Sequence, residues 1–200
     1  MSKYDLVIEP DLPPVDHPMP ELPENEDLWI FGYGSLMWRP GFEHKAVADA
    51  QIYGYHRSFC VSSVVHRGTR ENPGLVLGLD AGGSCRGKAI LCPASIREPV
   101  IDYLYRREMV TKVYVPKMVS LKLLNDGRRV SALTFVADPH HEQYCGSPSI
   151  EDAAKIIARA SGRGGPNRDY LYSTVEHLDE FGIKDGPLHA IMQLVQKLGE

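Results

Sequence analysis

The 200-residue sequence has no apolar run that approaches the length of about eighteen residues that a membrane-spanning helix requires. Its four cysteines include no CxxC pair and follow no signal peptide, which argues against a zinc ribbon and against a disulfide scaffold. A net charge of −4 gives no strong field of either sign, so neither nucleic acid nor a membrane surface is expected as a partner. These absences predict a cytoplasmic protein.

The glycine-rich run LWIFGYGSLMWRP, from Leu28 to Pro40, lacks the features of the common nucleotide cradles. A dinucleotide fingerprint requires a third glycine where Met37 stands, and no lysine follows to complete a P-loop. It is not a serine-hydrolase elbow, because Gly34 directly precedes Ser35 and Met37 stands two places after it. What remains is a short apolar strand and a turn. The turn has two possible roles. It either only leads the chain out of a core strand, or it presents backbone amides to a carboxylate, a phosphate or an oxyanion.

Composition divides the chain near residue 27. Residues 1–27 contain six prolines and eight acidic residues against a single lysine, which predicts an extended or disordered acidic arm. Residues 28–200 are long enough to bury one substantial core, because 43% of the whole sequence is hydrophobic. We therefore expect one domain over residues 28–200.

The pattern of this domain predicts an α+β protein. From Asp49 to Asp138 it is mostly strand-like, with a hairpin turn at Asn125-Asp126-Gly127 and one inserted helix from about Ser95 to Met109. The remainder is helical. The predicted helices run from a cap at Ser149 to about Ala160, from a cap at Asn167 to Gly182, and from Asp185 to Leu198.

The inserted helix holds the candidate catalyst, Glu108. Ile101, Leu104 and Tyr105 form an apolar stripe, and Glu108 occupies position i+7 of that stripe. Burial and the C-terminal end of the helix dipole both raise the pKa of such a carboxyl group. The neighbouring Arg106 or Arg107 can lower that pKa again, and an ion pair with one of them is the alternative role for Glu108.

Five sequence blocks, in order, closely resemble those of the ChaC-type glutathione-specific γ-glutamylcyclotransferases. They are FGYGSLMWRP, HRGTRENPG, CRGKAI, YLYRREM and the run GxGGPNRDYL that ends at Leu171. The resemblance extends from about Leu28 to the C-terminus. It implies a mixed β-barrel with packed helices, no cofactor, and cleavage of reduced glutathione into 5-oxoproline and cysteinylglycine.

The resemblance also assigns roles to residues. The catalytic glutamate corresponds to Glu108, and the substrate loop corresponds to Gly32, Tyr33, Gly34, Ser35, Leu36 and Met37. In the implied reaction the α-amine of the substrate attacks its own γ-carbonyl, so the chemistry needs neither a protein nucleophile nor a metal. A carboxyl group can move the protons, and amides of the turn can stabilise the oxyanion.

One segment departs from the family pattern. Many relatives have Gly-Gly-Tyr after the catalytic glutamate, whereas this chain has Lys112, Val113 and Tyr114. The replacement predicts a stiffer, more cationic segment that can change substrate preference. Tyr114 and Tyr170 are further candidates for substrate binding, and amphipathic packing is the alternative role for both.

Two other functions stay open from the sequence. The chain can act on other γ-glutamyl-amino acids or γ-glutamyl-amines, or it can be a non-catalytic module that binds a small carboxylate. Arg67 and Arg70 are either ligands of a substrate carboxylate or solvated charges. We expect no metal site at His140 and His141, because adjacent histidines in an extended segment point in opposite directions.

Overall fold

The computed structural model describes residues 20–23 and 25–199, so most of the predicted acidic arm, residues 1–27, lies outside the described residues. The chain forms two compact units. The first unit comprises the chain up to His56 together with Ala81–Asp138, and the second comprises Arg57–Asp80 and the chain from Pro139 onward. The long strands β2 and β3 each contribute residues to both units.

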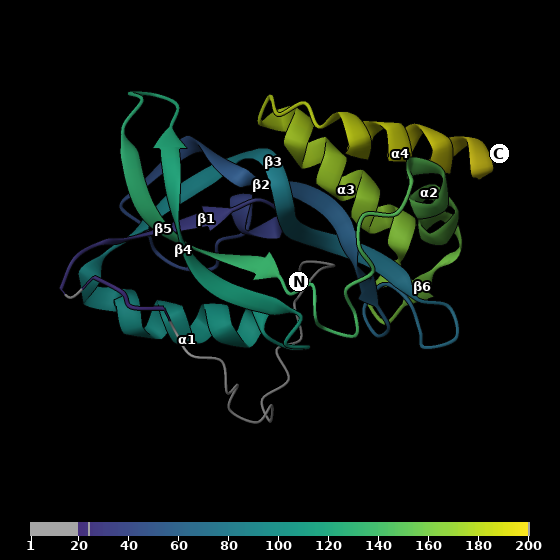
Figure 1. Ribbon diagram of the computed structural model, residues 1–200, viewed down its shortest axis with the longest axis horizontal. Helices are drawn as coiled ribbons and strands as arrows, with labels where there is room; N and C mark the ends of the chain where they lie inside the picture. The colour runs from purple at the N-terminus through teal and green to yellow at the C-terminus, as the bar shows by residue number, and fades with distance from the viewer. Residues whose placement is uncertain (1–19, 24, 200) are drawn as a thin grey trace. The chain divides into compact units, whose positions relative to one another are not determined.

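Five strands close into a barrel in the order β1-β3-β2-β4-β5 (Figure 1). The strands are β1 (Leu28–Gly32), β2 (Ala46–Ser63), β3 (Gly74–Cys92), β4 (Tyr114–Leu123) and β5 (Arg129–Ala137). β1 is antiparallel to β3 and parallel to β5, so the barrel is mixed. This confirms the predicted fold class.

The hairpin between β4 and β5 follows from its turn chemistry. Gly127 has φ 75°, a left-handed conformation that glycine adopts at little cost, and its amide donates to the carbonyl of Leu123 at 3.0 Å. The two strands then pair from Lys122 opposite Arg129 to Tyr114 opposite Ala137. The turn predicted at Asn125-Asp126-Gly127 is confirmed.

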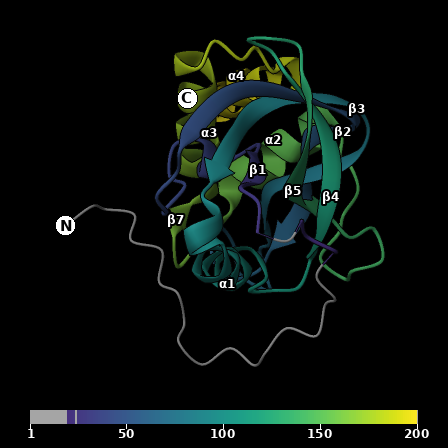
Figure 2. The same cartoon turned by 90° about the vertical axis from the view of Figure 1, so that its left-hand side faces the viewer.

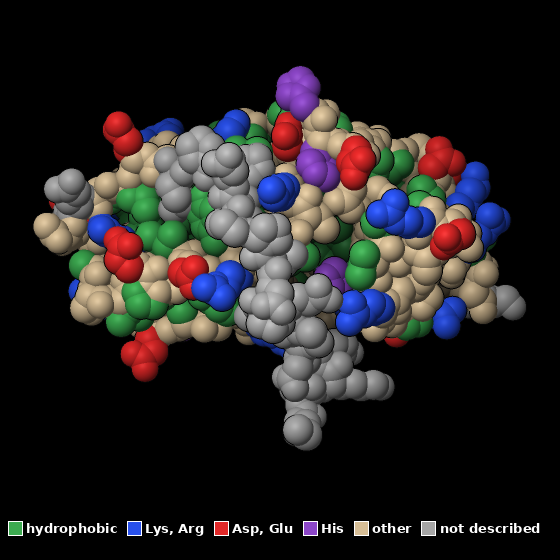
Figure 3. Space-filling view, turned by 90° about the horizontal axis from the view of Figure 1, so that it is seen from below, with side chains coloured by type: hydrophobic (Ala, Val, Ile, Leu, Met, Phe, Trp, Pro, Cys, Tyr) green, Lys and Arg blue, Asp and Glu red, His purple; other side chains and the backbone are tan. Residues whose placement is uncertain are grey.

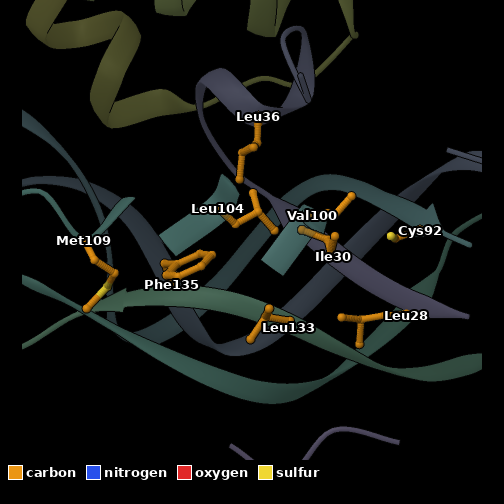
Figure 4. Packing of buried hydrophobic residues seen from close by; sticks show 9 residues of the cluster. All are labelled: Leu28, Ile30, Leu36, Cys92, Val100, Leu104, Met109, Leu133 and Phe135. Atoms are coloured by element: carbon orange, nitrogen blue, oxygen red, sulfur yellow. The ribbon is translucent and has the colours of Figure 1, made fainter. Parts of the chain in front are cut away.

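Helix α1 (Arg97–Glu108), preceded by the short 3-10 helix η2 (Ala94–Ile96), lies beside the barrel strands (Figures 1 and 2). The predicted inserted helix is thus confirmed within two residues at each end. Val100 and Leu104 bury one face of α1 in a cluster with Ile30, Leu133 and other apolar side chains of the barrel. Figure 4 shows Leu36, from the predicted substrate loop, directed toward Leu104 in the same cluster.

The second unit contains α2 (Ile150–Arg159), α3 (Asn167–Glu180), α4 (Gly186–Leu198) and a short hairpin of β6 (Ser161–Gly162) and β7 (Gly165–Pro166). The three helices pack against one another (Figure 2). Ser149 caps α2 by accepting from the amide of Asp152, as predicted. Asp185, the predicted start of the third helix, caps α4 by accepting from the amide of Leu188.

The predicted cap at Asn167 is wrong. Helix α3 begins at Asn167 and has no side-chain cap. The fully buried side chain of Asn167 instead accepts from the Leu75 amide at 2.7 Å and donates to the Leu75 carbonyl at 2.8 Å. The side-chain amide therefore satisfies the backbone of β3 as a neighbouring strand would. No local sequence pattern predicts this role, because Leu75 is distant in the sequence.

Lys, Arg, Asp and Glu side chains are interspersed on the face of the molecule that carries α1, without a large patch of one sign (Figure 3). Within the described residues, no helix combines the length and the apolar character needed to cross a membrane.

Candidate active site

The predicted substrate loop, Gly32 to Met37, begins at the last residue of β1 and includes the 3-10 helix η1 (Ser35–Met37). The amide of Met37 donates to the Gly34 carbonyl at 2.9 Å, and the amide of Arg39 donates to the Ser35 carbonyl at 2.8 Å. Gly32 leaves little room for a side chain, because a Cβ atom there would lie 3.0 Å from the Leu36 Cβ and 3.2 Å from the Met37 nitrogen. The loop is therefore a tightly closed turn held by its own backbone.

Apolar packing fixes this loop against the barrel. Tyr33, Leu36 and Met37 are all buried, and Leu36 belongs to the core cluster that also contains Leu104 of α1. The loop and the helix that carries Glu108 thus share one core, so their spacing cannot change without disturbing it.

Arg107 joins the end of α1 to the loop through hydrogen bonds. Its Nη2 donates to the Ser35 Oγ at 2.8 Å, and its Nη1 donates to the Arg39 carbonyl at 2.5 Å and to the Tyr103 hydroxyl at 3.0 Å. The side chain is only 3% exposed. A guanidinium fork of this kind holds several acceptors in fixed directions, so it positions Ser35 relative to α1.

Glu108 is the last residue of α1, and its Oε1 lies 3.1 Å from the Arg107 Nε. Its side chain is 20% exposed. Burial raises the pKa of the Glu108 carboxyl group, while the charge and hydrogen bond of Arg107 act to lower it. Glu108 and Ser35 are thus partners of the same guanidinium, which brings the candidate catalyst to the predicted substrate loop.

The sequence missed the role of Arg107. The sequence pattern predicts only a neighbour that lowers the pKa of Glu108, or pairs with it, whereas Arg107 is buried and binds the loop. The buried face of α1 is centred on Val100, Leu104 and Arg107, so Glu108 lies at the edge of this face rather than at its centre. The i, i+4, i+7 spacing of these three residues was the available signal.

The segment after Glu108 keeps a glycine-like backbone without a glycine. Lys112 has φ 59°, in the left-handed region that disfavours side chains with a Cβ atom, and its amide donates to the Met109 carbonyl at 3.2 Å. Tyr114 follows as the first residue of β4, opposite Ala137, and packs against the core cluster.

Tyr170 belongs to the second unit, on α3. Its hydroxyl accepts from the Leu77 amide at 3.4 Å, its ring contacts Phe59 edge-on, and the Arg67 guanidinium lies 5.3 Å from the ring centroid. Arg67 also donates to the Gly164 carbonyl at 2.5 Å, so its guanidinium binds the β6–β7 turn. These contacts are structural, and substrate binding by Tyr170 stays a prediction.

The described part of the chain contains no group of three or more His, Cys, Asp or Glu side chains that could hold a metal ion.

Comparisons with known proteins show the family of the chain. The model of the ChaC-like protein family matches residues 28–198, and the chain belongs to this family. It is 39% identical over 176 residues to the glutathione-specific γ-glutamylcyclotransferase of Escherichia coli K12, which covers 88% of this chain and 76% of that protein. It is 32% identical over 198 residues to the human glutathione-specific γ-glutamylcyclotransferase 1, covering 93% and 89% of the two chains.

A solved structure shares the fold. The crystal structure of a γ-glutamyl cyclotransferase specific to glutathione from yeast matches with a TM-score of 0.77 and 24% sequence identity. The match covers 86% of this chain and 97% of the yeast chain.

Proposed function

We propose that this chain is a γ-glutamylcyclotransferase that cleaves reduced glutathione into 5-oxoproline and cysteinylglycine. Its membership of the ChaC-like family and its relatives in E. coli and human, both named as specific to glutathione, support this activity. The observation that carries the proposal is the shared guanidinium. Arg107 binds both the Glu108 carboxylate and the Ser35 hydroxyl oxygen, which supports a role for Glu108 as the acid–base group beside the predicted substrate loop.

Glu108 transfers the protons in the proposed mechanism. Its carboxylate takes a proton from the substrate α-ammonium, and the free amine attacks the γ-carbonyl to form a tetrahedral intermediate. The protonated carboxyl group then delivers that proton to the departing cysteinyl nitrogen as the amide bond breaks. The regenerated carboxylate takes the second proton from the new ring nitrogen, which leaves the neutral lactam of 5-oxoproline, and passes it to the released amine of cysteinylglycine. Glu108 ends the cycle ionised, so no other proton donor and no protein nucleophile is required.

The environment of Glu108 suits both halves of this cycle. Burial raises the pKa of the carboxyl group, which makes it a stronger base and favours its protonated form during the second step. Arg107 opposes this shift and keeps the carboxylate available at neutral pH. The opposing effects of burial and Arg107 allow one residue to accept and return a proton.

The loop from Gly32 to Met37 binds the glutamyl part of the substrate in this proposal. The Met37 amide already donates to the Gly34 carbonyl, and the amides of Gly34, Ser35 and Leu36 are the donors proposed for the oxyanion. Tyr33 and Ser35 are proposed to contact the α-carboxylate and amine, with Tyr114 and Tyr170 as further substrate contacts. Bending the glutamyl chain in this loop supplies the proximity that an intramolecular attack requires.

We further propose that the enzyme works in the cytoplasm. All four cysteines, Cys60, Cys85, Cys92 and Cys145, are free thiols in the structure, as a reducing compartment favours.

Product analysis tests the proposed function. The purified chain is incubated in parallel with reduced glutathione and with γ-glutamyl-alanine, and 5-oxoproline is measured together with the released amine product. We expect 5-oxoproline and cysteinylglycine in equal amounts from glutathione, and much slower release from γ-glutamyl-alanine. Faster turnover of γ-glutamyl-alanine would assign the chain to other γ-glutamyl-amino acids. Absence of 5-oxoproline from both substrates would contradict cyclotransferase activity.

A further inference from the structure

Cys60 and Cys145 lie opposite each other on two extended segments of the second unit. Val61 forms an antiparallel bridge with Tyr144. On one side of this bridge the Cys145 amide donates to the Cys60 carbonyl at 2.9 Å. On the other side the Ser62 amide donates to the Gln143 carbonyl at 2.7 Å. This register pairs Cys60 with Cys145 and directs both side chains to the same face.

The backbone geometry of this pair suits a disulfide. Residues opposite each other at a hydrogen-bonded antiparallel position have Cα atoms about 5.5 Å apart, and disulfides most often join Cα atoms about 5.5–6 Å apart. Cys92, by contrast, stands opposite Leu28 of β1 in the barrel. The pairing of Cys60 with Cys145 is therefore a specific feature of the second unit.

We propose that Cys60 and Cys145 form a redox-modification site, which a low-molecular-weight disulfide oxidises to an intramolecular disulfide. The exposed Cys145 thiolate attacks one sulfur of the reagent and releases the other half as a thiol, leaving a mixed disulfide on Cys145. The buried Cys60 then attacks the Cys145 sulfur, and the second thiol departs. Two protein thiols are oxidised and one reagent disulfide is reduced to two thiols, which carry the two protons.

The surroundings of the pair make this oxidation slow. Burial, with the nearby Asp80 carboxylate and the Cys145 thiol, raises the pKa of Cys60 to about 12. Burial and Asp80 also raise the pKa of Cys145. Because the thiolate is the attacking form, few molecules react at any moment near neutral pH. The site therefore responds to a sustained oxidising condition rather than to a brief one.

The proposed disulfide would strengthen an attachment that already exists. The Asp80 carboxylate accepts from the Tyr144 hydroxyl at 3.0 Å and from the Ser147 hydroxyl at 3.1 Å, which holds the segment around Cys145. A covalent bond from Cys145 to Cys60 would fix the same segment to β2, so the oxidised protein should unfold at a higher temperature than the reduced one.

Mass spectrometry of the whole chain after incubation with oxidised glutathione tests the site. This readout is covalent, so it does not depend on the proposed enzymatic function. We expect the native protein to lose the mass of two hydrogen atoms and to yield one cross-linked peptide pair containing Cys60 and Cys145. Dithiothreitol should restore the reduced mass and the lower unfolding temperature.

Single substitutions test which thiol attacks the reagent and which thiol resolves the mixed disulfide. Cys60→Ala should stop at a stable mixed disulfide on Cys145, and Cys145→Ser should not form the disulfide. Cys92→Ala is the matched control at another buried cysteine, and it should form the disulfide as the unchanged chain does. If Cys60→Ala fails to fold, Cys145→Ser, a change at an exposed position, still decides the question. A native protein that stays fully reduced, stops at the mixed disulfide, or joins another pair would overturn the proposal.

Discussion

The two units each contain a buried arginine paired with a carboxylate, and the two pairs differ in what else the carboxylate binds. In the second unit the Arg57 Nη1 lies 2.8 Å from the Asp185 Oδ2, with side chains 2% and 13% exposed. In the first unit the Arg107 Nε lies 3.1 Å from the Glu108 Oε1, with side chains 3% and 20% exposed. Burial and charge alone therefore do not separate a structural ion pair from the one proposed to be catalytic.

The remaining contacts separate them. Asp185 also accepts from the Leu188 amide at 3.3 Å and caps α4, where the helix dipole favours a negative charge. Glu108 ends α1, where the dipole disfavours a negative charge, and its polar contact among the described residues is with Arg107 alone. Asp185 is held in place by two elements, whereas the Glu108 carboxyl group has a raised pKa and the capacity to exchange a proton.

The largest expected effect is on turnover when Glu108 is changed to Gln. The amide keeps the shape of the side chain but cannot transfer the proton, so kcat should fall by roughly 10²–10⁴-fold. Stability should change little, because burial disfavours the charge on Glu108 and Arg107 keeps its hydrogen bonds to Ser35, the Arg39 carbonyl and Tyr103. The checks are 5-oxoproline release and thermal unfolding. Near-normal turnover by a folded Gln variant would contradict the role given to Glu108.

Asp185→Asn should give the opposite pattern and is the matched control. Asn retains a good helix cap but leaves the buried Arg57 beside a neutral group, which typically costs about 3 kcal/mol or more. We expect the unfolding temperature to fall by roughly 10 °C while kcat of the folded protein is retained. Loss of kcat with unchanged stability would erase the distinction between the two pairs.

Arg107→Lys sharpens the comparison within the first unit. A lysine keeps the charge but cannot bind Ser35, the Arg39 carbonyl and Glu108 together, because it lacks the planar fork. Misplacement of the loop relative to Glu108 should lower kcat/KM by roughly 10–100-fold. Steady-state kinetics with glutathione measures this loss. Unchanged kinetics would show that the guanidinium does not position the loop.

The smallest expected effect is a gain in stability from Lys112→Gly. Lys112 has φ 59°, which costs a residue with a Cβ atom about 1 kcal/mol relative to glycine. The variant should therefore unfold about 2–4 °C higher. Thermal unfolding measures the change. A lower unfolding temperature would mean that the Lys112 side chain makes contacts worth more than the backbone strain.

Local sequence patterns predict the helices, strands and turns, whereas the contacts around the candidate site depend on residues far apart in the sequence. The turn glycine Gly127 and the caps Ser149 and Asp185 act on their own neighbours, so each was recognisable from the sequence. Arg107 and Asn167 bind residues 72 and 92 positions away, at Ser35 and Leu75, and no local periodicity encodes such partners. The place of Glu108 at the helix end and the family resemblance both point to it as the catalyst, and this role stays a prediction.

The dependence of kcat/KM on pH, measured for the unchanged chain and for the residual activity of Glu108→Gln, tests the central claim most directly. A general base must be ionised in the free enzyme, so kcat/KM should fall as the pH drops through the pKa of Glu108. Because burial raises that pKa, the midpoint should lie above 4.5, the ordinary value for glutamate, and the Gln variant should lack this acidic limb. The same acidic limb in both proteins would contradict the account, because another group would then control the proton transfer.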